Sequence, residues 1–244
     1  MPEPAVVTSI VLPVRDERDN LAPLLDELRV ALGAGARAYE IIAVDDGSTD
    51  GSREELAQLR RDMPPLRVIA LARPSGQSAA LAAGWDAARG DVVVMLDADG
   101  QNDPRDIPPL LARLDAEPGL AAAVGYRVGR RDSRWKLVQS RIANRIRNWL
   151  TRDRVRDTGC SLKAVRRPVL QGLARFDGMH RFLPTLIRLS GGTVAELPVS
   201  HRPRRSGASK YTARNRAWPA LRDAFGVRWL RRRPLRYEAR EETG

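Results

Sequence analysis

A run of acidic and amide side chains begins directly after five apolar residues at 92–96 and ends at Asp103. Carboxylates this close together repel one another unless a positive group lies among them. Asp97, Asp99 and Gln101 offer only oxygen ligands, and no His or Cys is nearby, which favours Mg²⁺ or Mn²⁺ over zinc. Because Mg²⁺ held by few carboxylates takes its other ligands from water and phosphates, the pattern indicates a metal that carries a diphosphate. A solvated acidic turn is the alternative interpretation.

Two further polar clusters, at residues 15–19 and 45–48, also follow runs of β-branched residues. Over residues 1–126 such runs alternate with amphipathic helical patterns, which predicts an α/β fold with a mainly parallel sheet covered on both faces. Ligands bind such sheets beyond the carboxyl ends of the strands, so we expect these clusters and the one at 97–103 to converge on one crevice. We expect strands within 6–14, 39–48, 66–73, 91–100 and 120–129, and helices within 18–32, 50–61, 76–89 and 106–117.

The ends of the expected elements add further predictions. Ser48 or Asp50 can cap the helix within 50–61 through its side-chain oxygen. In the second half of the chain the pattern predicts a helix within 181–192 and a strand within 193–204, followed by a polar loop.

The composition is typical of a globular protein, with 244 residues and a hydrophobic content of 43%. No apolar run approaches the roughly 18–20 residues that span a bilayer. No basic segment precedes the apolar stretch near the N-terminus, so no signal peptide is predicted. The single cysteine, Cys160, excludes an intrachain disulfide and is interpreted as a packing residue. These features predict a cytoplasmic location.

The charge is divided unevenly between the two halves of the chain. Residues 1–126 contain 12 Arg and Lys against 21 Asp and Glu, whereas residues 127–244 contain 30 against 9. Two basic segments, 131–150 and 213–244, also carry tryptophans at helical spacing, which is typical of helices that lie on an anionic membrane surface. The alternatives are that these helices pack on the core of the protein, or that the basic surface is merely solvated.

Six stretches occur in an order that resembles the inverting family 2 glycosyltransferases with the GT-A fold. The resemblance covers roughly residues 6–212 and is closest to the polyprenyl-phosphate branch, which includes dolichol-phosphate mannosyltransferase and its bacterial relatives using undecaprenyl phosphate. Arg15 departs from the aromatic residue usual in the first motif, and Asp16 replaces the usual Asn. The stretches are PVRDERDN, VDDGSTD, GQSAALAAGWDAARGD, LDADGQNDP, DTGCSLKAVRR and PVSHRPRRSGASKY.

The resemblance implies a donor, an acceptor and the residues that meet each of them. The donor would be a UDP- or GDP-sugar, the acceptor a polyprenyl phosphate such as undecaprenyl or dolichyl phosphate, and the metal Mg²⁺ or Mn²⁺. It also implies a catalytic domain at 1–212. Because the acceptor would be a lipid, we expect the basic tail at 213–244, with its tryptophans, to attach to the inner face of the cell membrane. The implied nucleotide-sugar-binding residues are Pro13, Arg15, Glu17, Asp45, Asp46 and Asp97; the metal ligands are Asp99, Gln101 and Asp97; and the cations for the acceptor phosphate are Arg127, Arg141, Arg204 and Lys210.

Other functions remain open at this point. The acceptor could be a glycan or another molecule without a lipid, or the chain could bind nucleotide without catalysis. A nucleic-acid-binding module would explain the basic half but not the acidic strand ends, and no recognised nucleic-acid-binding motif is present, so no nucleic-acid partner is expected. The sequence leaves the sugar, the base and the oligomeric state undetermined.

Overall fold

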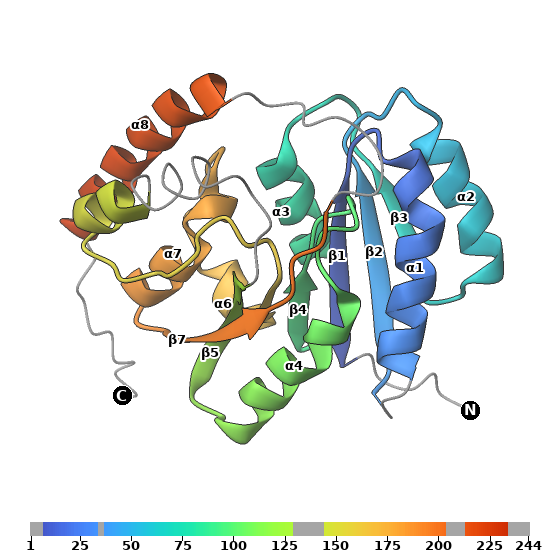
Figure 1. Cartoon of the computed structure of the whole chain (residues 1–244), viewed down its shortest axis with the longest axis horizontal. Helices are drawn as coiled ribbons and strands as arrows, with labels where there is room; N and C mark the ends of the chain where they lie inside the picture. Colours follow the sequence, from blue (N-terminus) through green and yellow to red (C-terminus); the bar gives the residue numbers. More distant parts are fainter. Residues whose placement is uncertain (1–6, 34–36, 129–143, 204–212, 234–244) are drawn as a thin grey trace, which may run out of the picture.

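The computed structural model describes residues 7–33, 37–128, 144–203 and 213–233, and it contains one seven-stranded sheet (Figure 1). The strand order is β3-β2-β1-β4-β6-β5-β7, and every strand except β6 runs in the same direction. The mainly parallel sheet expected from the sequence is therefore confirmed. The strands are β1 (Thr8–Val14), β2 (Tyr39–Asp45), β3 (Leu66–Ala70), β4 (Val92–Met95), β5 (Leu120–Arg127), β6 (Lys163–Arg166) and β7 (Thr193–Val199).

Helices cover both faces of this sheet, because successive side chains of a strand point to opposite faces. On β1, Ile10 and Leu12 pack in a core with α1, α2 and α4, whereas Val11 packs in a second core with α3, α6, α7 and α8. The helices are α1 (Arg18–Gly33), α2 (Ser52–Asp62), α3 (Gln77–Ala87), α4 (Ile107–Ala116), α6 (Arg167–Gln171), α7 (Leu183–Leu189) and α8 (Ala213–Arg231), with short 3-10 turns η1 (Pro104–Asp106) and η2 (Met179–Arg181).

Two local features differ from the sequence predictions. The residue before α2 is Gly51, at φ 90°, and it is the N-cap in place of Ser48 or Asp50. Asp50 still lies at this helix end, where its Oδ1 accepts hydrogen bonds from the backbone and hydroxyl of Ser52. Strand β6 was not predicted. It inserts antiparallel between β4 and β5.

The basic tail forms a helix that is partly built into the protein. Ala224 and Val227 of α8 are buried in the second core, while Phe225 and Trp229 are exposed on another side of the helix. Residues 144–151 form a second helical segment, in which Leu150 is buried and Trp149 is exposed. Both segments therefore combine a packed side with an apolar side that faces solvent.

Gly90 allows the chain to pass very close to β1 as it enters β4. A Cβ atom at this position would lie 2.7 Å from Ser9 N and 2.8 Å from Thr8 C, and backbone atoms cannot move aside as a flexible side chain does. We expect Gly90→Ala to lower the free energy of unfolding by about 1–3 kcal/mol, measured by urea denaturation. Gly119→Ala is the control, since a Cβ there meets nothing within 4 Å. Equal unfolding midpoints for the two variants would contradict this account.

Candidate active site

The polar clusters predicted from the sequence lie at the carboxyl ends of β1, β2 and β4. The chain proceeds from β1 to β2 and β3 on one side, and then returns to place β4 on the other side of β1. This reversal of strand order is a topological switch point, where open α/β sheets leave a crevice for ligands. The order of the strands alone therefore predicts a ligand site beside the residues that follow β1 and β4.

The loops after β1 and β2 are joined by hydrogen bonds. Arg15 donates from Nη1 to the carbonyl oxygen of Asp46 at 2.9 Å, and the same atom lies 3.7 Å from an Asp46 carboxylate oxygen. The backbone of Asp16 donates to the hydroxyl of Ser48, and the backbone of Ser48 donates to the carboxylate of Asp45. Pro13 lies at the end of β1, and Glu17 accepts a hydrogen bond from Asn20. The residues expected to meet the nucleoside thus lie on adjoining loops.

A third loop, which ends where α3 begins at Gln77, connects the loops after β1 and β2 to the acidic cluster. The buried carboxylate of Asp46 accepts hydrogen bonds from the backbone of Ser75 at 2.5 Å and of Gly76 at 2.8 Å. Gln77, at the start of α3, then donates from Nε2 to Asp97 Oδ1 at 2.7 Å. Asp46 therefore holds the loop that orients Asp97, a role that its sequence position did not reveal.

Asp97 and Asp99 form a close acidic pair after β4. Burial, followed by the negative charge of Asp99, raises the pKa of Asp97 to about 6. Asp99 is only 6% exposed, and its Oδ1 accepts a hydrogen bond from the backbone of Gln101 at 3.1 Å. Two charged carboxylates this close repel each other, and a bound cation relieves that repulsion.

The residues around this pair fit a magnesium or manganese ion. The available donors are carboxylate and amide oxygens, as expected from the sequence. Within the described parts of the chain, no three His, Cys, Asp or Glu side chains gather into a complete metal site. Mg²⁺ and Mn²⁺ sites with few protein ligands take the others from substrate phosphates and water. Asp99, Gln101 and Asp97 are the residues that would hold the ion.

The segment that follows β7 lies directly against the acidic loop. Arg202 donates from its backbone to the carbonyl oxygen of Gln101 at 2.9 Å, and its guanidinium pairs with Asp103 at 2.6 Å and with Glu27 at 2.7 Å. Burial raises the pKa of Asp103, but hydrogen bonds from Arg105 and Arg202 outweigh it and lower the pKa to about 2. These contacts therefore fix Arg202 beside the predicted metal ligands.

Strand β6 brings a buried lysine to the same edge of the sheet. Lys163 pairs with Met95 of β4 in the sheet, and its Nζ donates to the carbonyl oxygen of Cys160. Burial lowers the pKa of Lys163, while its charge interacts favourably with Asp97 and Asp157. Lys163 therefore supplies positive charge that favours the ionised form of Asp97. The signal for this role in the sequence is a lysine between the apolar residues Leu162 and Ala164.

Arg127, expected to meet the acceptor phosphate, is paired with a carboxylate in this structure. Its Nε and Nη2 donate to the two oxygens of Asp157 at 2.7 and 2.9 Å. Burial raises the pKa of Asp157, and the bonds from Arg127 outweigh it, so this pKa lies below its ordinary value. Arg127 does reach the edge of the sheet near Asp97 and Lys163, since its charge influences both groups. Its role toward an acceptor stays a prediction.

The remaining predicted cations, Arg141, Arg204 and Lys210, lie outside the described residues. The apolar positions Trp135, Val138 and Ile142 of segment 131–150 also lie outside them. Five further residues of the site belong to the motifs quoted above, but the sequence alone assigns no role to any of them. They are Gln77, Asp157, Ser161, Lys163 and Arg202.

The fold and site define the class of this protein. A solved structure of glucosyl-3-phosphoglycerate synthase from Mycobacterium tuberculosis, in complex with Mn²⁺, UDP-glucose and phosphoglyceric acid, has a TM-score of 0.69 to this chain at 22% sequence identity. The similarity covers 91% of this chain and 80% of that one. The chain has the GT-A fold of glycosyltransferases that use nucleotide sugars. The model of the family described as Glycosyl transferase family 2 matches residues 9–173, so the chain belongs to that family.

Two curated relatives lie in the polyprenyl-phosphate branch that the motifs resemble. The dodecaprenyl-phosphate galacturonate synthase of Rhizobium johnstonii is 32% identical over 98% of this chain and 70% of its own length. The undecaprenyl-phosphate 4-deoxy-4-formamido-L-arabinose transferase of Pseudomonas paraeruginosa is 38% identical over 87% of this chain. The match spans 62% of that second relative, slightly less than two thirds.

Proposed function

We propose that this protein transfers a sugar, with inversion, from a nucleoside-diphosphate sugar to a polyprenyl phosphate. The observation that carries the proposal is the loop from Asp97 to Gln101, which contacts the donor-side loop through Gln77 and the segment after β7 through Arg202. The names of the two curated relatives described above each contain a polyprenyl phosphate, which supports the acceptor class.

Some residues of the crevice would bind the nucleotide sugar, and others would orient it. Pro13, Arg15 and Glu17 would line the nucleoside pocket, with Asp45 or Asp46 at the base or ribose. Asp97, oriented by Gln77, would position the nucleotide. A divalent cation held at Asp99 and Gln101 would supply positive charge to the diphosphate.

The acceptor needs positioning more than it needs a general base. A phosphate monoester is already ionised at neutral pH, so one of its oxygens can form the new bond to the anomeric carbon. The bond from that carbon to the donor diphosphate breaks, and the nucleoside diphosphate leaves with the electron pair. Bringing two phosphate groups together requires cations, and we assign this task to Arg127, Arg141, Arg204 and Lys210.

A lipid acceptor also requires attachment to a membrane. No helix in the described part of the chain is both long and apolar enough to cross a bilayer. We propose a peripheral position on the inner face of the cell membrane, with the segments 131–150 and 213–244 as the contact. The exposed Trp149 and Trp229 support this position, because tryptophan beside arginine is typical of interfacial helices.

A donor and acceptor screen tests the proposed function. The purified chain is incubated with UDP- or GDP-sugars and undecaprenyl phosphate, and release of the nucleoside diphosphate is measured. Phosphoglyceric acid serves as the soluble comparison acceptor, since it is bound by the structural neighbour. We expect release only with the lipid phosphate. Release with the soluble acceptor alone would favour the alternative of a non-lipid acceptor.

A further inference from the structure

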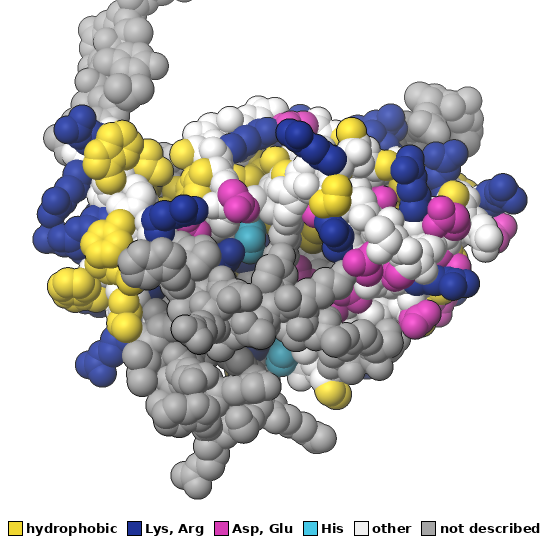
Figure 2. Space-filling view, turned by 90° about the horizontal axis from the view of Figure 1, so that it is seen from above, with side chains coloured by type: hydrophobic (Ala, Val, Ile, Leu, Met, Phe, Trp, Pro, Cys, Tyr) yellow, Lys and Arg dark blue, Asp and Glu magenta, His cyan; other side chains and the backbone are white. Residues whose placement is uncertain are grey.

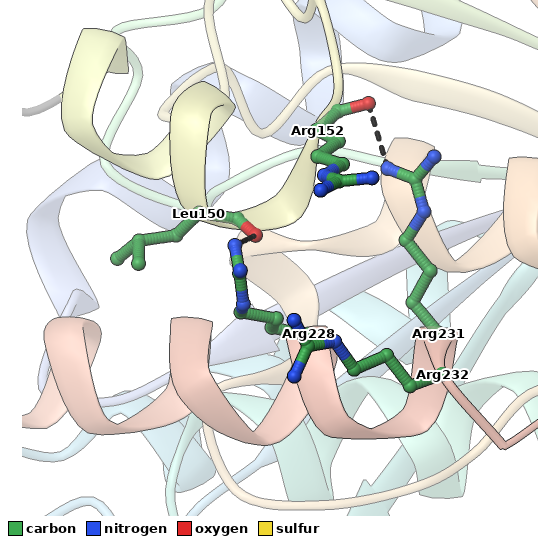
Figure 3. Close-up of a pocket in the computed structure, with 5 residues that line it drawn as sticks. All are labelled: Leu150, Arg152, Arg228, Arg231 and Arg232. Atoms are coloured by element: carbon green, nitrogen blue, oxygen red, sulfur yellow. Dashed lines mark hydrogen bonds between the residues drawn. The ribbon is translucent and has the colours of Figure 1, made fainter.

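Four arginines line a small cavity where α8 meets the end of helical segment 144–151 (Figure 3). Arg152 lies immediately after the segment, Arg228 and Arg231 lie at the end of α8, and Arg232 follows that helix. The cavity has a volume of about 180 Å³. Ligand pockets for whole small molecules are usually about 300–1,000 Å³, so this volume suits a single phosphate group better than a nucleotide sugar.

Hydrogen bonds to backbone carbonyls hold two of these arginines in place. Arg228 donates to the carbonyl oxygen of Leu150 at 3.2 Å, and Arg231 donates to those of Thr151 and Arg152 at 2.6 and 2.8 Å. These carbonyls end a helical segment, where the backbone dipole favours positive charge. Each guanidinium has five donors, so these one or two bonds fix its position and leave further donors for a ligand.

The cavity has positive charge without a matching acid among the described residues. Within them, no Asp or Glu oxygen lies within 4.0 Å of any of the four guanidinium groups, whereas elsewhere Arg127, Arg188 and Arg202 each pair with carboxylates. Four cations around one cavity repel one another, and an anion between them removes that repulsion. Arginine binds phosphate oxygens strongly, because its planar group forms paired hydrogen bonds.

Exposed apolar side chains beside the cavity indicate where the anion comes from. In the described residues, four of the six exposed large hydrophobic side chains lie on these two segments. Figure 2 shows hydrophobic and basic side chains together at the end of the molecule where Figure 1 places α8. The four are Ile146 (48% exposed), Trp149 (70%), Phe225 (54%) and Trp229 (57%).

We propose that this cavity binds the phosphate headgroup of an anionic phospholipid while the neighbouring aromatic side chains enter the membrane interface. Phe225 and Trp229 are one helical turn apart and so lie on one side of α8. Arg228 also lies over the Trp149 ring, 6.0 Å from its centroid, so the basic and apolar groups are in contact. The buried Ala224 and Val227 tie α8 to the core, so a bound headgroup would hold the whole catalytic domain at the membrane. This site deepens the membrane attachment proposed above, but it requires no step of the transfer reaction.

Vesicle flotation of the full chain tests the site by point substitution. Deletion of α8 would expose Ala224, Val227 and the core around them, so truncation is not used. The double variant Arg152→Gln, Arg232→Gln removes two exposed guanidinium groups that line the cavity. The control Arg145→Gln, Arg222→Gln removes two exposed charges from the same two segments, outside the cavity.

We expect the wild-type chain to float with vesicles of phosphatidylcholine and phosphatidylglycerol, but not with phosphatidylcholine alone. The cavity variant should bind the anionic vesicles about tenfold more weakly or worse, while the control stays close to wild type. Equal losses in both double variants would overturn the proposal, because diffuse surface charge predicts that result.

Two further measurements test whether the cavity prefers a lipid headgroup to other anions, and whether its effect is independent of the active site. Tryptophan fluorescence during titration with inorganic phosphate should change little without vesicles, and saturation by phosphate alone would overturn the lipid assignment. Binding of RNA that depends on the same two arginines would also overturn it. The cavity variant should keep wild-type transfer to a detergent-solubilised polyprenyl phosphate; a loss there equal to the loss of flotation would place the defect in folding or in the active site.

Discussion

Replacement of Asp99 by Asn is expected to lower the transfer rate by about 100-fold or more, which corresponds to roughly 3 kcal/mol of transition-state stabilisation. The substitution keeps the size of the side chain and removes a negative charge from a buried pair. Asp99 is 6% exposed, and after burial its negative charge is the next cause that raises the pKa of Asp97 to about 6. An asparagine offers one neutral oxygen in place of a charged carboxylate, and so holds a divalent cation weakly.

Two measurements distinguish this effect from loss of folding. Calorimetric titration of Mn²⁺ in the presence of UDP should show weaker binding to Asp99→Asn, and circular dichroism should show an unchanged fold. Asp91→Asn is the matched control, because Asp91 precedes the same strand at its opposite, exposed end. Full activity of the wild-type protein in excess EDTA would contradict the metal site.

Replacement of Arg204 by Ala is expected to abolish transfer while leaving the affinity for the nucleotide-sugar donor almost unchanged. Arg204 lies outside the described residues, but Arg202, two positions earlier, donates its backbone hydrogen bond to Gln101. The resemblance assigns Arg204 to the acceptor phosphate, and such a cation would bring an anionic acceptor to the donor diphosphate.

The measurement pairs a kinetic assay with donor titration by calorimetry. A donor affinity that falls as much as the rate would assign Arg204 to the donor diphosphate. Arg205→Ala removes the same charge from the adjacent position and serves as the control. We expect Arg205→Ala to retain most of the activity, since the resemblance assigns no role to this residue.

Most of the sheet and the position of the site follow from the sequence because both depend on strong local patterns. Val92–Met95 is a wholly apolar run that leads into acids, and the five leucines of α1 repeat along one face. The first pattern specifies a strand that is buried on both sides, and the second specifies the buried face of a helix. The carboxyl ends of parallel strands then meet at one edge without further information.

The parts that escaped prediction depend on pairing between distant segments. Strand β6 has four residues with a charge at each end, and it forms only because β4 and β5 bond to its two edges. The sequence likewise does not show that Asp46 turns its carboxylate toward the backbone of Ser75 and Gly76. Nor does it show that Arg127 meets Asp157, 30 positions away.

The late position of β6 in the chain has a consequence for synthesis. During translation β4 and β5 emerge before residues 163–166, and they border this strand from opposite sides without pairing to each other. Until β6 arrives, a nascent chain therefore carries β4 as an open, wholly apolar edge, which is prone to non-native pairing. Purified chains truncated after β5 should accordingly bind chaperones more strongly than the full chain. The acidic pair next to β4 would gain the countercharge of Lys163 only when the sheet closes.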